Sequence, residues 1–303
     1  MMTSRCPVAA STIIALAALA PLPAAGQTTA RTPWGDPDLQ GTYTNKTITP
    51  LQRPADLAAQ EFLTQEETAN LEQATVDQNR RLLTRPARRT AATESVDRGE
   101  DGAPGFYNNF WLDRGTTSTG RTSLIVDPLD GRIPALTPEA QRREDARAET
   151  RRARGPADVW TDLDLNDRCM LWSVGPPMVP TGYNNNYLIL QTPHHVVIHV
   201  EMIHDTRIIP LDGRPHLASD MRQWHGDARG HWEGNTLVVE TTNIRRTTAN
   251  AAAVGGDPVL LRAANGRTDD TITVTERFTR ADAGTIDYKF TINDPTQWTQ
   301  TFS

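Results

Sequence analysis

The amino-acid sequence predicts a mainly β protein, an antiparallel meander that closes into a lipocalin-like up-and-down barrel with short helical excursions. Two observations favour this fold. From residue 160 onward, runs rich in β-forming residues alternate with turn signals such as Asp212-Gly213 and Gly234-Asn235. No helical pattern separates these runs, so successive strands are expected to pair as hairpins. Closing such a meander removes its exposed edges, which predicts roughly eight to ten strands. A β-sandwich is the alternative.

Residues 1–26 predict a signal peptide. A single charge, Arg5, precedes an apolar run over residues 8–22, and the small residues Ala24, Ala25 and Gly26 favour cleavage before Gln27. The competing reading is a membrane anchor, but an apolar run of about 15 residues is short for a bilayer. We therefore expect a periplasmic or secreted protein without a membrane partner after cleavage.

Residues 27–103 predict an irregular N-terminal arm, a helix and a mobile loop. Prolines and glycines over residues 33–43 predict a turn-rich backbone. A helical pattern covers residues 55–83, where Thr64 and Glu67 form a capping-box pair. Its apolar stripe is thin and runs through Leu71, Ala74, Gln78 and Leu82. Residues 86–104 are rich in Arg, Thr, Gly and acidic residues and predict a surface loop.

Residues 104–303 are assigned to the barrel domain. Phe106, Tyr107, Phe110 and Trp111 form either a core strand or the wall of an aromatic ligand pocket. Residues 121–136, with Asp130-Gly131 as the turn, predict a hairpin. A charged surface helix is expected near residues 138–154, because Pro138 occupies a favoured first helical position.

The remaining strands of the barrel are predicted from alternating and β-rich runs. They cover residues 169–174, 188–191, 195–203, 206–211, 230–233, 236–241, 271–279 and 285–293.

Charge and cysteine content limit the classes of partner. The formal net charge is −6 and the basic residues form no single strip, which argues against nucleic acid. Cys169 alone remains after signal cleavage, so no internal disulfide is expected. It is either a buried inert thiol or a reactive nucleophile. The expected oligomeric state is a monomer or dimer.

All seven histidines lie between His194 and His231. Histidine suits proton transfer or metal ligation at neutral pH, so this stretch is the predicted functional region. Within residues 195–203, the period of two places Val196, Ile198, Val200 and Met202 on one strand face. The other face carries His195, His199 and Glu201, and it lines either a cavity or the solvent-exposed surface.

A cavity-lining face predicts an enzyme with metal-independent acid–base chemistry (a lyase, isomerase or hydrolase) on a small organic molecule. His199 is the candidate base and Glu201 the carboxylate that orients it. Arg207 is the candidate clamp for negative charge. His204 and Asp205 are supporting residues or, alternatively, simple turn residues. No cofactor is expected.

Two alternatives remain. His195, His199 and Glu201 have the ligand types of a zinc or iron site, although their spacing is not that of the helical H-E-x-x-H signature. A non-catalytic carrier of a hydrophobic or aromatic ligand is the second alternative. The predicted substrate-binding residues are Phe106, Tyr107, Trp111, Trp172, Tyr187, His195, His231 and Glu233, the last two of which repeat the His–Glu alternation.

Four motifs resemble those of a large family of exported, mostly uncharacterised bacterial proteins. They are PWGDPDLQGT at residues 33–42, RTSLIVDPLDGRIP at 121–134, EMIHDTRIIPLDGRPH at 201–216 and GHWEGNTLVVETTN at 230–243. The resemblance implies export but no established activity or catalytic residues. It also implies a further segment with Cys and His beyond Trp298, whereas this sequence ends at Ser303, which leaves open a disulfide partner for Cys169 and the completeness of a family site.

Overall fold

A computed structural model describes residues 30–84, 113, 115–153, 158–159, 175–245 and 272–303 of the chain. Several predicted features lie outside these residues: the signal peptide, the loop at 86–104, the aromatic run with Phe106, Tyr107 and Trp111, and the strand with Cys169 and Trp172. The described part is mainly β, as predicted, and its eight strands form two antiparallel sheets of four strands each.

The first sheet has the order β1-β2-β3-β4. Its strands are β1 (Gly41–Thr44), β2 (Asn186–Gln191), β3 (His195–Val200) and β4 (Thr206–Pro210). The edge strand β1 comes from the N-terminal arm and pairs with β2. The arm is therefore part of the β structure.

The second sheet has the order β5-β6-β7-β8. Its strands are β5 (Asp227–Glu233), β6 (Thr236–Thr242), β7 (Thr273–Arg280) and β8 (Ile286–Asn293). The predicted turn at Gly234-Asn235 joins β5 to β6, and Gly234 has the positive φ of 62° that a tight hairpin turn requires.

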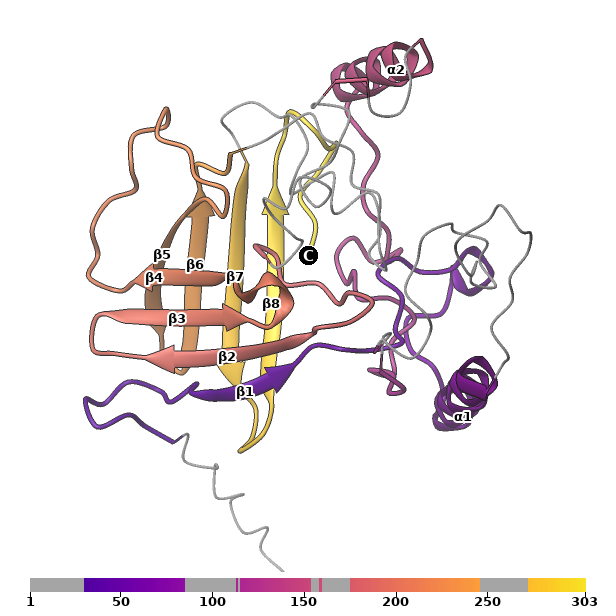
Figure 1. The fold of residues 1–303 in the computed structure, drawn as a ribbon, viewed down its shortest axis with the longest axis horizontal. Helices are drawn as coiled ribbons and strands as arrows, with labels where there is room; N and C mark the ends of the chain where they lie inside the picture. Colours follow the sequence, from indigo (N-terminus) through magenta and orange to yellow (C-terminus); the bar gives the residue numbers. More distant parts are fainter. Residues whose placement is uncertain (1–29, 85–112, 114, 154–157, 160–174, 246–271) are drawn as a thin grey trace, which may run out of the picture.

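The two sheets stack face to face with their strands crossing at a steep angle (Figure 1). No barrel closes among the described strands, because no hydrogen-bonded ladder joins β4 to β5. Close contact replaces the ladder: a Cβ on Gly230 of β5 would lie 2.7 Å from Leu211 Cδ2. A side chain at this position would require Leu211 or Ile209 to shift. The packing of the two sheets fits the β-sandwich alternative as well as an open barrel.

The core lies between the sheets. Val196, Ile198 and Val200 of β3 point inward and are at most 1% exposed. They pack in one cluster with Leu237 and Phe278 of the second sheet. The predicted alternation of β3 is confirmed. A second cluster around Ile292 and Trp298 packs against residues 121–136.

The predicted hairpin at residues 121–136 is wrong. This segment has no strand, because its backbone pairs with other parts of the chain instead of with itself. Leu124 N donates to Pro50 O, Ile125 N to Leu51 O, and Val126 N to Ser303 O.

Two helices lie to one side of the sheets: α1 (Gln65–Thr84) and α2 (Pro138–Arg152) (Figure 1). The capping box is confirmed, since Thr64 N donates to Glu67 Oε2 at 2.7 Å and Glu67 N donates to Thr64 Oγ1 at 3.1 Å. α1 begins later than predicted because residues 55–57 form a separate 3₁₀ turn. No residue of α1 is buried. Neither described helix is apolar enough over a sufficient length to cross a membrane.

Candidate functional site

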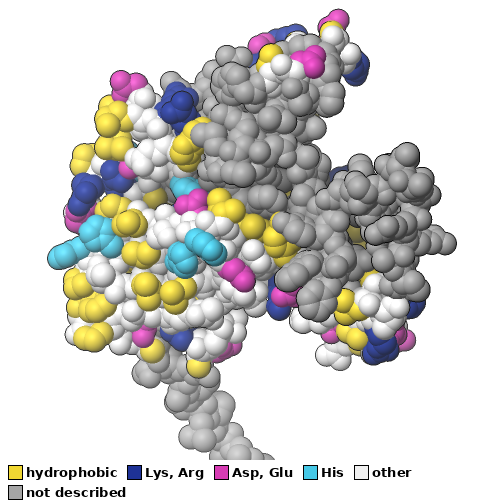
Figure 2. All heavy atoms as spheres, in the orientation of Figure 1, with side chains coloured by type: hydrophobic (Ala, Val, Ile, Leu, Met, Phe, Trp, Pro, Cys, Tyr) yellow, Lys and Arg dark blue, Asp and Glu magenta, His cyan; other side chains and the backbone are white. Residues whose placement is uncertain are grey.

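The predicted catalytic pair lies on the outer face of the first sheet. His199 Nδ1 is 2.9 Å from Thr206 Oγ1, and Glu201 accepts a hydrogen bond from Asn186 Nδ2 at 2.8 Å. Figure 2 looks onto this face, where histidines lie among hydrophobic side chains at the surface. The structure does not join His199 to Glu201. β3 ends at Val200, so Glu201 begins a 3₁₀ turn and leaves the strand alternation that predicted the pair.

The other predicted catalytic residues, His204, Asp205 and Arg207, also lie apart from one another in their contacts. His204 is exposed in the turn with a positive φ of 59°, which agrees with the simple turn reading. Asp205 turns toward His225, and Arg207 points into the core between the sheets. The five predicted catalytic residues therefore do not share one site.

Asp205 and His225 form a partly buried pair that no spacing in the sequence predicts. His225 Nε2 is 2.5 Å from Asp205 Oδ2, and His225 Nδ1 is 3.0 Å from Gly175 O. Both ring nitrogens of His225 therefore face oxygen atoms of the protein. The pair ties together three segments of the chain, and neither ring nitrogen is left to contact a ligand.

Arg207, the predicted clamp, forms a buried ion pair with Glu276 of β7. Arg207 Nη1 lies 3.0 Å from Glu276 Oε1, the second nitrogen contacts Oε2, and the two side chains are 3% and 0% exposed. Tyr288 donates to Glu276 Oε1 at 2.8 Å and accepts from Met178 N at 2.9 Å. The pair crosses the core and joins the two sheets, so it has a structural role in this geometry.

Burial and charge set the protonation states around this pair. Burial opposes the charge of Arg207, but the attraction of Glu276 outweighs it and raises the pKa of Arg207. Burial raises the pKa of Tyr288 well above its ordinary value and that of Tyr187 to about 12. Both phenols stay protonated at neutral pH. Tyr187, a predicted binding residue, is 4% exposed within the core.

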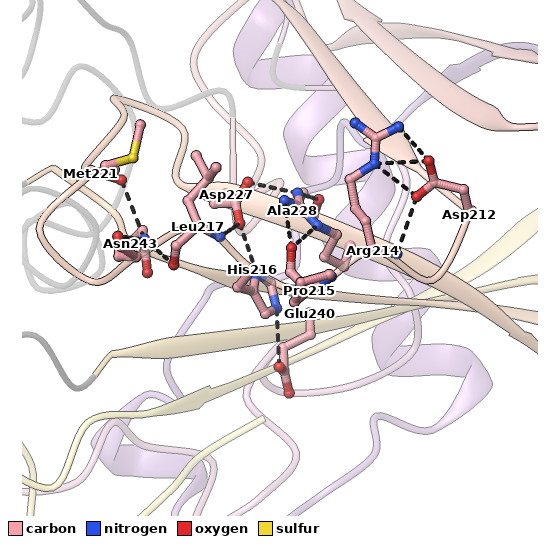
Figure 3. A network of polar contacts seen from close by, with 12 residues as sticks. Asp212, Arg214, Pro215, His216, Leu217, Met221, Asp227, Ala228, Glu240 and Asn243 are labelled. Atoms are coloured by element: carbon pink, nitrogen blue, oxygen red, sulfur yellow. Dashed lines mark hydrogen bonds and ion pairs between the residues drawn. The ribbon is translucent and has the colours of Figure 1, made fainter.

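A second His–Asp pair fastens the connection between β4 and β5 (Figure 3). His216 Nδ1 is 2.9 Å from Asp227 Oδ2, and its Nε2 is 3.3 Å from Glu240 Oε1. Asp227 also accepts from Leu217 N at 2.9 Å and from Arg229 Nη1 at 2.6 Å. All these partners hold residues 215–217 against the edge of the second sheet.

The environment of Asp227 predicts a pH dependence of stability. Burial acts to raise the pKa of Asp227, but hydrogen bonds from Leu217, His216 and Arg229 outweigh it and hold that pKa below its ordinary value. Asp227 therefore stabilises the fold fully above its unfolded pKa, and this contribution is lost as pH falls through the folded pKa. We expect Asp227→Asn to flatten the fall in the free energy of unfolding below about pH 4.

Urea unfolding at a series of pH values checks this expectation. Asp287→Asn is the matched control, because the side chain of Asp287 is exposed on β8 and makes no hydrogen bond or ion pair within the described residues. An Asp227→Asn profile with the wild-type slope would contradict the assigned role of the hydrogen bonds.

The repeated His–Glu pattern on β5 lies at the surface. His231 Nε2 is 3.2 Å from Glu233 Oε1, with side chains 60% and 48% exposed, and Arg277 Nη1 is 2.8 Å from Glu233 Oε2. His195 is half-buried on the outer face of the other sheet. Within the described ranges, no three His, Cys, Asp or Glu side chains are arranged to hold a metal ion.

A ligand-sized pocket lies elsewhere, between α1 and the N-terminal arm. Its volume is about 450 Å³. α1 contributes four residues at helix positions i, i+3, i+4 and i+7, namely Thr75, Gln78, Asn79 and Leu82. The other lining residues are Thr47, Ile48, Thr49, Pro50, Leu51, Gln52, Gly115, Leu124, Val179, Pro180 and Thr181. None of these fifteen residues has an ionisable side chain.

The sequence gives one partial signal for this pocket. The thin stripe predicted on the helix includes Gln78 and Leu82, which do face the pocket, whereas Leu71 is 39% exposed. A smaller pocket of about 250 Å³ adjoins the first at Gln52 and is lined by residues 133–136, Glu144, Gln297 and Trp298.

Comparisons of the chain with protein-family models, with curated proteins and with solved structures found no match in any of the three.

Proposed function

We propose that the protein is an exported small-molecule carrier whose ligand occupies the pocket between α1 and the N-terminal arm. The observation that supports this proposal is a ligand-sized pocket whose lining side chains are all uncharged among the described residues. Its volume falls within the range of roughly 300–1,000 Å³ that is usual for small-molecule sites. The signal-like leader supports export.

The construction of α1 supports the same conclusion. A helix packed on a core normally presents an apolar stripe to it. The positions of α1 that line the pocket are Thr75, Gln78, Asn79 and Leu82, of which only Leu82 is apolar, and the helix buries no residue. Such a stripe suits contact with a bound molecule better than contact with a core.

The chemistry of the lining favours binding over turnover. General acid–base catalysis requires a titratable group within hydrogen-bond reach of the ligand. Among the described lining residues there are only hydroxyl, amide and aliphatic side chains. His199 and Glu201, the candidates for such chemistry, lie on the outer sheet face and do not line this pocket.

Titration with N-phenylnaphthylamine, an uncharged dye that fluoresces in apolar surroundings, tests the proposal. We expect saturable binding to the wild type and at least about a tenfold loss of affinity in Gln78→Trp, since the indole fills the pocket. Gln73→Trp is the matched control, because Gln73 is exposed on the opposite side of α1 and does not line the pocket. It is expected to bind like the wild type.

Equal affinity in both variants would place the dye elsewhere and contradict the proposed pocket. A small molecule that is extracted from the purified protein and recovered unchanged after incubation supports a carrier. Conversion of that molecule would support the acid–base alternative instead.

A further inference from the structure

We infer that the ligand of this pocket is an uncharged amphipathic molecule, with an apolar body and one amide or hydroxyl group directed at α1. The inference rests on the proposed function and assigns the chemical class of the ligand. It depends on three features of the pocket: its aliphatic side chains, the charges around it, and the hydrogen-bonding groups that its own structure leaves unused.

The lining outside α1 includes four large aliphatic side chains. Ile48, Leu51 and Leu124 are half-buried there, and Val179 is 7% exposed. Leu124 N and Ile125 N are bonded to the carbonyls of residues 50 and 51, so the backbone there already has partners. Contact with these side chains removes apolar ligand surface from water, which favours binding by roughly 25 cal/mol per Å².

Two charged side chains near the pocket already have partners among the described residues. Lys46 Nζ lies 3.0 Å from Asp113 Oδ2, beside the lining residue Gly115. Glu72, one turn before the lining stripe of α1, accepts a hydrogen bond from Ser118 N at 2.8 Å. An ionised ligand would lose hydration without gaining a counter-charge from the described lining, and that loss is costly.

Hydroxyl groups in the lining have little left to donate. Thr75 Oγ1 donates to Leu71 O at 2.8 Å, within its own helix. Thr47 Oγ1 donates to Thr117 O at 2.9 Å, and Thr181 Oγ1 to Tyr183 O at 2.6 Å. These hydrogens hold the protein's own backbone, so the threonines mainly shape the pocket.

The amides of Gln78 and Asn79 differ from these threonines. Neither side chain makes a hydrogen bond in the part of the chain that the structure describes. Each amide offers two N–H donors and one carbonyl acceptor. Two such groups side by side on α1 match a ligand group that both donates and accepts, such as an amide or a hydroxyl.

Dansylamide and dansylate test the inference as a pair, because they differ only in a neutral sulfonamide in place of a sulfonate of similar size. We expect dansylamide to bind at least about tenfold more tightly than dansylate. Replacing both amides, in Gln78→Leu with Asn79→Leu, is expected to weaken dansylamide about five- to tenfold. The matched control Gln73→Leu, at an exposed position of α1 that does not line the pocket, is expected to bind dansylamide within about twofold of the wild type.

The outcomes separate this inference from the proposed function. If dansylate binds as tightly as dansylamide, or if neither binds while N-phenylnaphthylamine does, the ligand class is wrong and the pocket still stands. An unchanged dansylamide affinity in the double variant overturns the assigned role of the two amides. If the wild type binds none of the three dyes, the proposed function itself is overturned.

Discussion

Glu276→Leu is expected to lower the free energy of unfolding by about 3–5 kcal/mol, because it leaves the charge of Arg207 buried without a partner. Arg207 and Glu276 are 4% and 0% exposed. Tyr288 also loses the acceptor that its hydroxyl contacts at 2.8 Å. Removal of a charge partner in such surroundings exposes the full cost of desolvation. Urea unfolding at neutral pH measures the loss.

The control is the double variant Arg207→Met with Glu276→Leu, which removes both charges and fills the space with apolar atoms. Apolar replacement of a buried ion pair is commonly neutral or stabilising, so the double variant is expected to recover most of the loss. If it is instead less stable than Glu276→Leu alone, then the ion pair is not the reason for the effect. The lower stability of the double variant would then mean that Arg207 stabilises the fold through its packing contacts.

The ion pair between Arg207 and Glu276 shows what local sequence patterns can and cannot predict. Alternation in β4 places Arg207 on the same face as Ile209, and the structure buries both. That pattern is local, whereas Glu276 lies 69 residues later, in the other sheet. Because the sequence pattern does not reveal Glu276 as the partner, it predicts that Arg207 binds negative charge on a ligand. The strand face of β3, by contrast, depends on neighbouring residues alone and was predicted correctly.

The predicted pairing of His199 with Glu201 is wrong for a related reason. His199 and Glu201 are close in sequence, but their pairing requires β3 to continue past Val200, whereas Glu201 has helical backbone angles (φ −60°, ψ −39°) and ends the strand. His225 pairs with Asp205, which is 20 residues away, so no spacing rule selects it. The pocket is assembled from residues between 47 and 181, and only its contribution from α1 has a readable period.

Gly226→Ala is expected to destabilise the fold by about 3 kcal/mol or more, combining a left-handed backbone with a steric clash. Gly226 has φ +73°, and a Cβ there would lie 2.6 Å from Thr242 O and 2.7 Å from Ile244 Cγ1. Thr242 O belongs to the backbone of β6 and cannot move aside as a flexible side chain can. The glycine also lies between His225 and Asp227, so any shift disturbs both His–Asp pairs.

Gly213→Ala isolates the steric contribution. Gly213 has φ +71°, nearly the same backbone conformation, but nothing lies within 4 Å of its added Cβ. Its substitution is expected to cost about 1–2 kcal/mol, the strain of a left-handed residue alone. Thermal and urea unfolding of the two variants give the difference, which we assign to the close approach of residues 226 and 242. Equal losses would mean that β6 yields at Thr242, and that the two His–Asp pairs tolerate movement of the segment between them.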